Sequence, residues 1–137
     1  MATFVDSNVI LDLFTENEEW FDWSASMLSQ AAENGRVVIN PIVYAEVSMG
    51  FDRIEEVDAA LPAAYFAREP LPWEASFLAA RAFLKYRRRG GARTSPLPDF
   101  FIGAHAAIAG YTLLTRDARR YRTYFPRLRI VAPRARA

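Results

Sequence analysis

The first twelve residues constrain the fold of this chain more than any other stretch. A short apolar run, residues 2–5, ends on Asp6 and passes directly into Ser7, Asn8 and a second apolar series. This order predicts a buried β-strand that ends in a carboxylate, followed by a helix capped by Ser7 or Asn8. In open parallel sheets, functional groups gather outside the carboxyl ends of the strands. We therefore expect chemistry first at Asp6; the alternative is that Asp6 only caps the following helix.

Short apolar runs alternate with amphipathic stretches along the rest of the chain. Apolar residues at three- and four-residue steps predict helices, whereas short apolar runs bounded by turn residues predict strands. Asn40 followed by Pro41 marks a helix start, because asparagine is a favoured cap and proline fits the first helical position. In the longest helix, Phe77 and Phe83 are expected to face the core. Beyond the first strand and helix, the pattern predicts strands at residues 36–40, 65–67, 111–115 and 128–131, and helices at residues 17–34, 41–50, 53–60, 72–89, 98–110 and just after Asp117.

The alternation of strands and helices indicates the fold class. Parallel strands joined by helices make right-handed crossovers, so we expect an α/β fold with a mostly parallel central sheet of four to five strands and helices on both faces. With 137 residues, 52% of them hydrophobic, the chain is long enough for one domain with a single core. We assign residues 1–132 to that domain and residues 133–137 to a short basic tail.

Composition excludes several classes of site. The chain has no cysteine, which rules out disulfide frameworks, thiolate zinc sites and cysteine nucleophiles, and is consistent with a reducing cytoplasm. Asp6 and Asp12 interrupt any signal-like apolar stretch. No run approaches the roughly 18 apolar residues of a membrane span. We therefore expect a soluble cytoplasmic protein that does not enter the membrane.

Charge is divided unevenly along the chain. Residues 1–60 hold 12 acidic and 2 basic side chains, whereas residues 61–137 hold 15 basic and 4 acidic ones. Lys85 is the only lysine; the other basic residues are arginines, whose planar guanidinium suits bidentate phosphate contact. This polarity indicates a polyanionic partner for the second half. The alternative is that the two halves of the chain pair internally.

Three further acids stand out beside Asp6. Asp117 follows the predicted strand at residues 111–115. Asp99 lies in the first turn of an apolar helix, and Glu46 lies mid-helix among apolar neighbours. Carboxylates that converge on one sheet edge repel one another, which keeps some of them protonated. Mg²⁺ or Mn²⁺ removes that conflict because these cations favour oxygen ligands. Such a site activates water and neutralises charge that develops on a phosphodiester.

Four segments of the chain resemble the signature segments of PIN-domain nucleases. They are FVDSNVILD at residues 4–12, YAEV at residues 44–47, PDFFIGAHA at residues 98–106 and LLTRD at residues 113–117. The length is similar to that of VapC-type toxins, which are the ribonuclease halves of bacterial toxin–antitoxin pairs. The likeness covers nearly the whole chain, but residues 52–93 follow no motif of the family.

The resemblance implies a metal-dependent endoribonuclease in which water attacks RNA phosphodiester bonds. The positions that match the family's acidic Mg²⁺- or Mn²⁺-binding quartet, and that we expect to be catalytic, are Asp6, Glu46, Asp99 and Asp117. The positions that match groups supporting the metal or the scissile phosphate are Ser7, Asn8 and Thr115. The family also implies a homodimer and a VapB-like antitoxin whose C-terminal segment covers the active site.

Arginines close to Asp99 in the sequence are the expected RNA contacts. Arginine holds phosphates through paired hydrogen bonds, and the loop after residues 87–89 leads directly into Asp99. The residues that we expect to bind RNA are Arg87, Arg88, Arg89, Arg93 and Arg116. The alternative is that the RNA backbone is held by the arginines of residues 116–122.

Two other functions stay open from the sequence. Aspartyl-phosphate hydrolases also place a nucleophilic Asp after the first strand, but Asn8 stands where the haloacid-dehalogenase pattern has a second Asp. The other alternative is a non-catalytic RNA-binding module, whose mark is the loss of an acid from the quartet. His105 points roughly 120° away from Asp99 around a helix, so we expect no catalytic role for it. Asp12 is expected to cap a helix or form a salt bridge.

Overall fold

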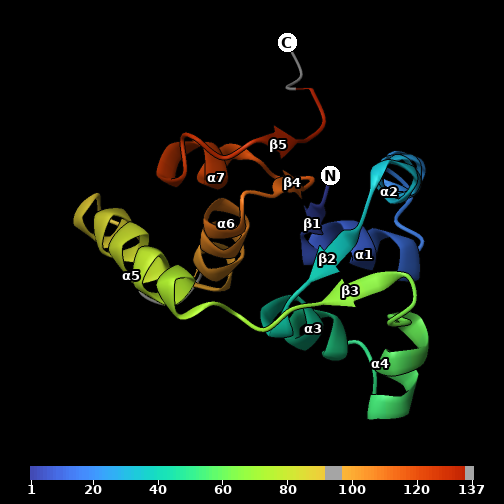
Figure 1. Ribbon diagram of the computed structural model, residues 1–137. Helices are drawn as coiled ribbons and strands as arrows, with labels where there is room; N and C mark the ends of the chain where they lie inside the picture. Colours follow the sequence, from blue (N-terminus) through green and yellow to red (C-terminus); the bar gives the residue numbers. More distant parts are fainter. Residues whose placement is uncertain (92–96, 135–137) are drawn as a thin grey trace.

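A parallel sheet forms the centre of this computed structural model, which describes residues 1–91 and 97–134 (Figure 1). Its strands in the described residues are β1 (Thr3–Val5), β2 (Val37–Ile39), β3 (Phe66–Arg68), β4 (Thr112–Leu114) and β5 (Ile130–Val131). They lie in the order β3-β2-β1-β4-β5, and every neighbouring pair is parallel. The predicted α/β class and parallel sheet of four to five strands are confirmed.

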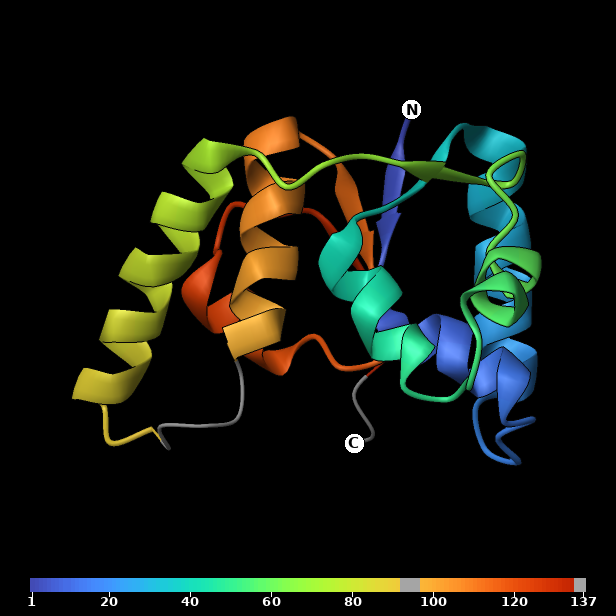
Figure 2. The same cartoon turned by 90° about the horizontal axis from the view of Figure 1, so that it is seen from below.

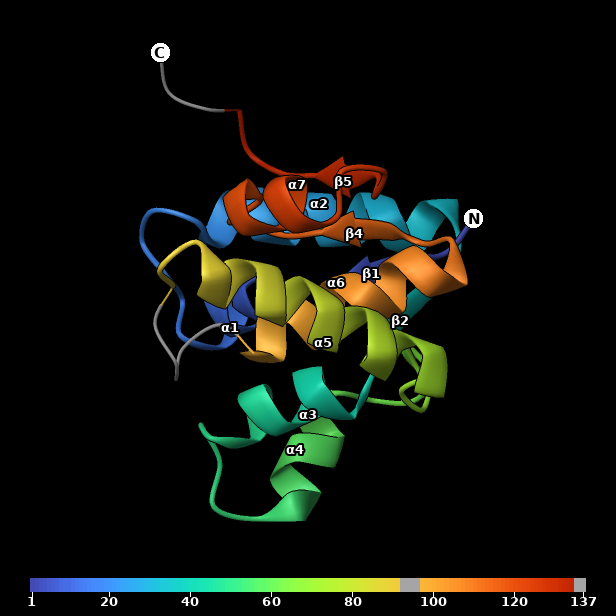
Figure 3. The ribbon, with the colours of Figure 1, turned by 90° about the vertical axis from the view of Figure 1, so that its left-hand side faces the viewer.

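Helices cover both faces of this sheet, as predicted. In the described part of the chain they are α1 (Ser7–Phe14), α2 (Phe21–Asn34), α3 (Pro41–Ser48), α4 (Ile54–Ala60), α5 (Trp73–Arg88), α6 (Leu97–Ala109) and α7 (Arg119–Tyr124). The pair α5 and α6 packs together on one face, and α2 lies on the opposite face (Figures 1 and 2). Helix α7 lies beside α6, along β4 and β5 (Figure 3).

The sheet extends on both sides of β1. Strands β2 and β3 extend from one side of β1, whereas β4 and β5 extend from the other. Val5, the last residue of β1, pairs with Leu114, the last residue of β4. Figure 2 shows these two strands side by side and pointing the same way. Residues that follow β1 and β4 therefore meet at a topological switch point, which is where open α/β sheets bind ligands.

The core lies between the sheet and its helix layers. Phe4, Val5 and Leu113 are fully buried, because strands of a parallel sheet are covered on both faces and read as continuous apolar runs. The prediction that Phe77 faces the core is wrong, since this side chain is 66% exposed. Helix α5 instead buries a stripe of alanines, and Phe77 lies outside that stripe with Arg81 stacked over its ring.

Gly103 allows α7 to approach α6 closely. A Cβ atom at this position would lie 2.5 Å from Cε2 of Phe125 and 3.0 Å from Cδ1 of Tyr121. Packed carbon atoms prefer about 3.5–4.0 Å, so any side chain here would push α7 away. This close approach brings Tyr121, near the C-terminal end of the sequence, next to Asp6, which follows β1.

Two further predictions concern membrane crossing and the domain boundaries. None of the helices in the described residues is both long enough and apolar enough to cross a membrane. The assignment of residues 1–132 to one domain and residues 133–137 to a basic tail stays a prediction.

Candidate active site

Asp6 follows β1 at the switch point and is 3% exposed. Its backbone takes the N-cap position of α1, with φ −69° and ψ 147°, but its side chain makes no capping hydrogen bond. The hydroxyls of Thr115 and Tyr121 both donate to Oδ2 of Asp6, at 2.8 Å and 2.9 Å. The carboxylate is therefore held at the sheet edge and does not cap the helix. The expectation that Ser7 or Asn8 caps α1 is wrong, because both residues lie inside the helix.

Glu46 reaches the same edge from α3. Asn40 starts that helix as predicted, and its side chain accepts two backbone N–H groups of the first turn. Glu46 lies in the last turns of the helix, where it is half-buried, and Oγ of Ser7 donates to its Oε1 at 2.9 Å. The same hydroxyl lies 3.5 Å from Oδ1 of Asp6. Ser7 thus connects two acids that are far apart in the sequence.

Asp99 and Asp117 complete the group of acids. Asp99 lies in the first turn of α6, and Nη1 of Arg120 donates to its Oδ2 at 2.6 Å. Asp117 is exposed in the loop between β4 and α7, and its backbone N–H donates to Oγ1 of Thr115 at 3.1 Å. Because Thr115 also donates to Asp6, one hydroxyl joins this loop to the end of β1.

The charges of these acids act on one another. Burial raises the pKa of Asp6 to about 6, and the nearby charge of Asp99 adds to the rise. Burial also raises the pKa of Glu46, with smaller contributions from the charges of Asp6 and Asp99. The pKa of Asp99 is raised by burial and by Asp117, although Arg120 opposes the rise. The group as a whole is therefore short of positive charge.

The donor set fits a hard divalent cation. Mg²⁺ and Mn²⁺ prefer oxygen ligands, and Mg²⁺ keeps several waters. The acids supply carboxylate oxygens, and a cation among them would offset the burial and the mutual repulsion that raise their pKa. Among the described residues, no three His, Asp or Glu side chains lie close enough together, as they stand, to hold a metal ion. The acids are held instead by Ser7, Thr115, Tyr121 and Arg120.

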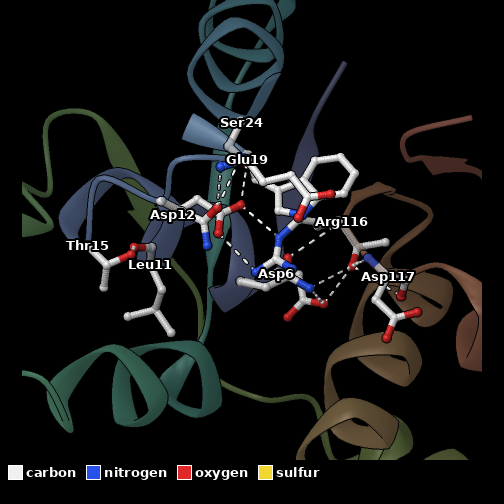
Figure 4. Close-up of polar contacts among 12 residues, drawn as sticks. Asp6, Leu11, Asp12, Thr15, Glu19, Ser24, Arg116 and Asp117 are labelled. Atoms are coloured by element: carbon white, nitrogen blue, oxygen red, sulfur yellow. Dashed lines mark hydrogen bonds and ion pairs between the residues drawn. The ribbon is translucent and has the colours of Figure 1, made fainter. Parts of the chain in front are cut away.

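A partly buried ion pair holds the loop between β4 and α7 in place (Figure 4). Nε and Nη2 of Arg116 donate to the two oxygens of Asp12, both at 2.9 Å. Oγ of Ser24 donates to the same buried carboxylate at 2.7 Å. The backbone N–H of Arg116 also donates to Oδ1 of Asn8 at 3.2 Å. The expected salt bridge of Asp12 is confirmed, and it ties α1 and α2 to the loop that carries Asp117.

The profile of the PIN domain family matches residues 3–126. The chain belongs to the PIN domain family. Similar solved structures include VapBC2 from Rickettsia felis bound to a DNA fragment from its promoter, at 19% identity and a TM-score of 0.72, covering 96% of this chain and 98% of that chain. VapBC-1 from nontypeable Haemophilus influenzae has 20% identity, a TM-score of 0.72 and the same coverage. A toxin–antitoxin complex from Klebsiella pneumoniae has 21% identity and a TM-score of 0.61, covering 87% of this chain and 89% of that chain. No curated protein matches the chain.

The predicted acids of this PIN domain come from four different segments. Asp6, Glu46 and Asp99 lie within electrostatic reach of one another, and Asp117 lies near Asp99. Two of the three predicted supporting residues, Asn8 and Thr115, donate to the carboxylate of Asp6, and the hydroxyl of the third, Ser7, donates to Glu46 and lies 3.5 Å from Asp6. Metal binding and catalysis by these residues stay predictions.

The predicted RNA contacts of the PIN domain lie in different surroundings. Arg87, Arg88 and Arg89 are exposed at the C-terminal end of α5. Arg93 lies outside the described residues. The side chain of Arg116 forms the partly buried ion pair with Asp12 described above. Contact of any of these arginines with RNA stays a prediction.

The sequence did not predict two contacts beside the acids, although Arg120 is part of the alternative RNA path over residues 116–122. Tyr121 and Arg120 lie on a six-residue helix, and their contacts with Asp6 and Asp99 depend on tertiary packing. The pattern did hold one signal: Tyr121 is the only residue of the stretch 119–122 that is not an arginine. A lone aromatic residue in a basic helix marks the side that is buried.

His105 belongs to the core rather than to the acidic group. It is 1% exposed, and burial lowers its pKa. Oδ1 of Asn40 accepts the N–H groups at the start of α3, so its Nδ2 faces Nδ1 of His105 at 3.0 Å. The other ring nitrogen, Nε2, then carries the proton and faces Glu69 at 3.5 Å. The ring is thus held neutral within the core, and the absence of a catalytic role for His105 stays a prediction.

Proposed function

We propose that this protein is a metal-dependent endoribonuclease of the VapC type, which hydrolyses RNA phosphodiester bonds as the toxin of a toxin–antitoxin pair. One observation carries the proposal. Asp6, Glu46 and Asp99 come from three different elements to the switch point of the sheet, and their charges raise pKa values within the group. Burying several carboxylates together costs stability, and a function that uses a cation explains why the chain keeps them.

In this proposal the four acids hold Mg²⁺ or Mn²⁺. When bound, the cation activates water and neutralises charge on the phosphate. The chain's own residues position the acids: Thr115 and Tyr121 fix the carboxylate of Asp6, and Ser7 fixes that of Glu46. No histidine is needed as a base, which agrees with the buried position of His105. The basic second half of the chain supports RNA as the substrate.

We also propose a VapB-like antitoxin as a partner, a homodimer and a cytoplasmic location. The support for the antitoxin is that similar folds were solved as VapBC and as a toxin–antitoxin complex. The absence of a membrane-spanning helix in the described residues agrees with the location. Co-purification of the protein with the product of a neighbouring gene for a small DNA-binding protein tests the partnership.

RNA cleavage by the purified protein tests the proposed activity. We expect the wild type to cleave structured RNA with Mg²⁺ and not with EDTA. Asp6→Asn and Asp99→Asn should each slow cleavage by about a hundredfold or more, because several kcal/mol of charge stabilisation depends on the cation. Asp52→Asn is the matched control, since Asp52 is exposed and lies outside the acidic group.

The same assay separates the alternative functions. Hydrolysis of a small phosphate monoester without RNA cleavage would favour an aspartyl nucleophile. RNA binding without cleavage in either Mg²⁺ or Mn²⁺ would favour a non-catalytic module. Either result contradicts the proposal.

A further inference from the structure

A cleft of about 340 Å³ opens next to the acidic group, between the C-terminal end of α5 and α7. Figure 3 shows these two elements side by side. We call this hollow the α5–α7 cleft, and its lining residues are Tyr86, Asp117, Arg119, Arg120, Thr123 and Tyr124. Because Asp117 belongs to both, the cleft is continuous with the acids. A wider hollow of about 500 Å³ lies beside Gly110 and Pro126, and none of the four acids lines it.

Two aromatic rings that line the α5–α7 cleft each carry a guanidinium group over the ring. The rings of Tyr86 and Tyr124 lie 6.0 Å apart, edge to face. The guanidinium of Arg120 lies over the ring of Tyr86 at 5.8 Å, and that of Arg89 over the ring of Tyr124 at 5.6 Å. Arg119 is exposed at the same cleft. Proteins that bind single-stranded nucleic acid combine these groups, since bases stack on aromatic or guanidinium planes while arginines hold phosphates.

Arg120 is the residue that joins the cleft to the acids. Its Nη1 donates to Oδ2 of Asp99 at 2.6 Å, and the two side chains are 35% and 31% exposed. An ion pair that is partly open to water contributes little stability and exchanges partners readily. In the proposed function Asp99 is a cation ligand, so a cation and Arg120 compete for the same carboxylate.

We propose that the α5–α7 cleft binds one nucleotide of single-stranded RNA beside the scissile phosphate, and that Arg120 transfers from Asp99 to the RNA phosphate when a divalent cation takes Asp99. This inference rests on the proposed function. Arg120 then has two successive roles. It neutralises Asp99 in the free protein, and it holds the RNA phosphate in the cation-bound protein. The aromatic rings take the base, and Arg119 adds a second positive charge at the rim.

Binding of phosphorothioate single-stranded RNA, which resists hydrolysis, tests the site. With Mg²⁺ present, Arg120→Ala should reduce the slope of log K against log salt by about 0.7, the value of one lost phosphate contact. With EDTA the same substitution should change the slope much less, because Arg120 is then held by Asp99. Arg81→Ala is the matched control, since Arg81 is an exposed arginine of α5 that stacks on Phe77 outside the cleft.

Cation binding without RNA tests the exchange of partners. Arg120→Ala should bind Mg²⁺ more tightly than the wild type, because no arginine competes for Asp99. Arg119→Ala removes the same charge from the same cleft but leaves the ion pair between Arg120 and Asp99 in place, so a smaller gain is expected. Equal gains in the two variants would mean that general charge, and not the ion pair, sets cation affinity, and would overturn the exchange.

The aromatic platform has its own test. Tyr124→Leu should weaken RNA binding by about fivefold or more, the usual loss for one stacked base, whereas Tyr124→Phe should keep it. Thermal unfolding shows whether the leucine variant is folded, and a folded variant with wild-type RNA affinity contradicts the platform.

RNA cleavage and RNA binding, measured on the same proteins, separate the α5–α7 cleft from the nuclease activity. A wild type that cleaves RNA with Mg²⁺, beside an Arg120→Ala protein with an unaltered salt slope, overturns the cleft alone. A wild type that neither cleaves RNA nor binds Mg²⁺ overturns the proposed function and the cleft together.

Discussion

At the scale of single residues, the surroundings of Asp6 contain two opposing effects. Hydroxyl groups of Thr115 and Tyr121 donate to its carboxylate and favour the charged form. Burial and the charge of Asp99 favour the neutral form, and they prevail, since the pKa of Asp6 rises to about 6. A side chain in this state is well oriented and poorly neutralised. That combination favours the binding of a cation.

The raised pKa makes the stability of the cation-free protein depend on pH. The folded-state pKa of Asp6, about 6, lies above its ordinary value of 3.8, so charging Asp6 destabilises the folded state as pH rises through this range. In EDTA, Asp6→Asn should therefore be more stable than the wild type at neutral pH by up to about 3 kcal/mol, and the gap should close near pH 4. The lowered pKa of His105 acts in both proteins and cancels. Urea unfolding across this pH range measures the gap, and a gap that does not change with pH would contradict the account.

The residue scale also shows where the sequence was insufficient. Asp6, Glu46 and Asp99 stood out because an acid among apolar neighbours is unusual in any sequence. The contacts of Arg120 and Tyr121 with these acids were not predicted, because nothing in a short basic helix says which acid a given side chain will meet. Their contacts join residues 21 and 115 positions apart, and only the packed fold shows them.

At the scale of elements, apolar runs and strong caps were the reliable signals. The helix start at Asn40 was predicted correctly, since its side chain accepts two N–H groups there. The helix predicted at residues 17–34 begins at Phe21, because the side chain of Asn17 accepts the N–H groups of Glu19 and Trp20 and closes a separate turn. The central strands were found because burial on both faces leaves continuous apolar runs.

The loop between β4 and α7 offers a test at the same scale. Asp12 is buried, whereas Arg116 is 30% exposed, so Arg116→Met leaves a buried charge without its partner. We expect this variant to lose about 3 kcal/mol of unfolding free energy. Adding Asp12→Asn should recover part of the loss, because the buried group is then neutral and still accepts from Ser24. Urea unfolding of the wild type, the two single variants and the double variant measures the coupling. If the double variant loses the sum of the two single losses, the pair does not hold the loop.

At the scale of the whole molecule, the uneven charge of the chain has two parts. Among the described residues, two ion pairs join an acid of the first half to an arginine of the second half: Asp58 with Arg68 and Asp12 with Arg116. Internal pairing therefore accounts for some of the asymmetry. Arginines at the end of α5 and on α7 gather instead around the α5–α7 cleft. This second part of the charge is the one that a polyanionic substrate would use.

If the acids bind the divalent cation that RNA hydrolysis needs, Mg²⁺ stabilises the folded protein, and thermal unfolding with and without Mg²⁺ measures that stabilisation. A cation that binds only the folded protein stabilises it by about 2.7 kcal/mol at a hundred times its Kd. We predict that Mg²⁺ raises the melting temperature of the wild type and of Asp52→Asn, and that Glu46→Gln and Asp99→Asn lose most of that rise. An equal rise in all four proteins, or no rise in the wild type, would contradict the account.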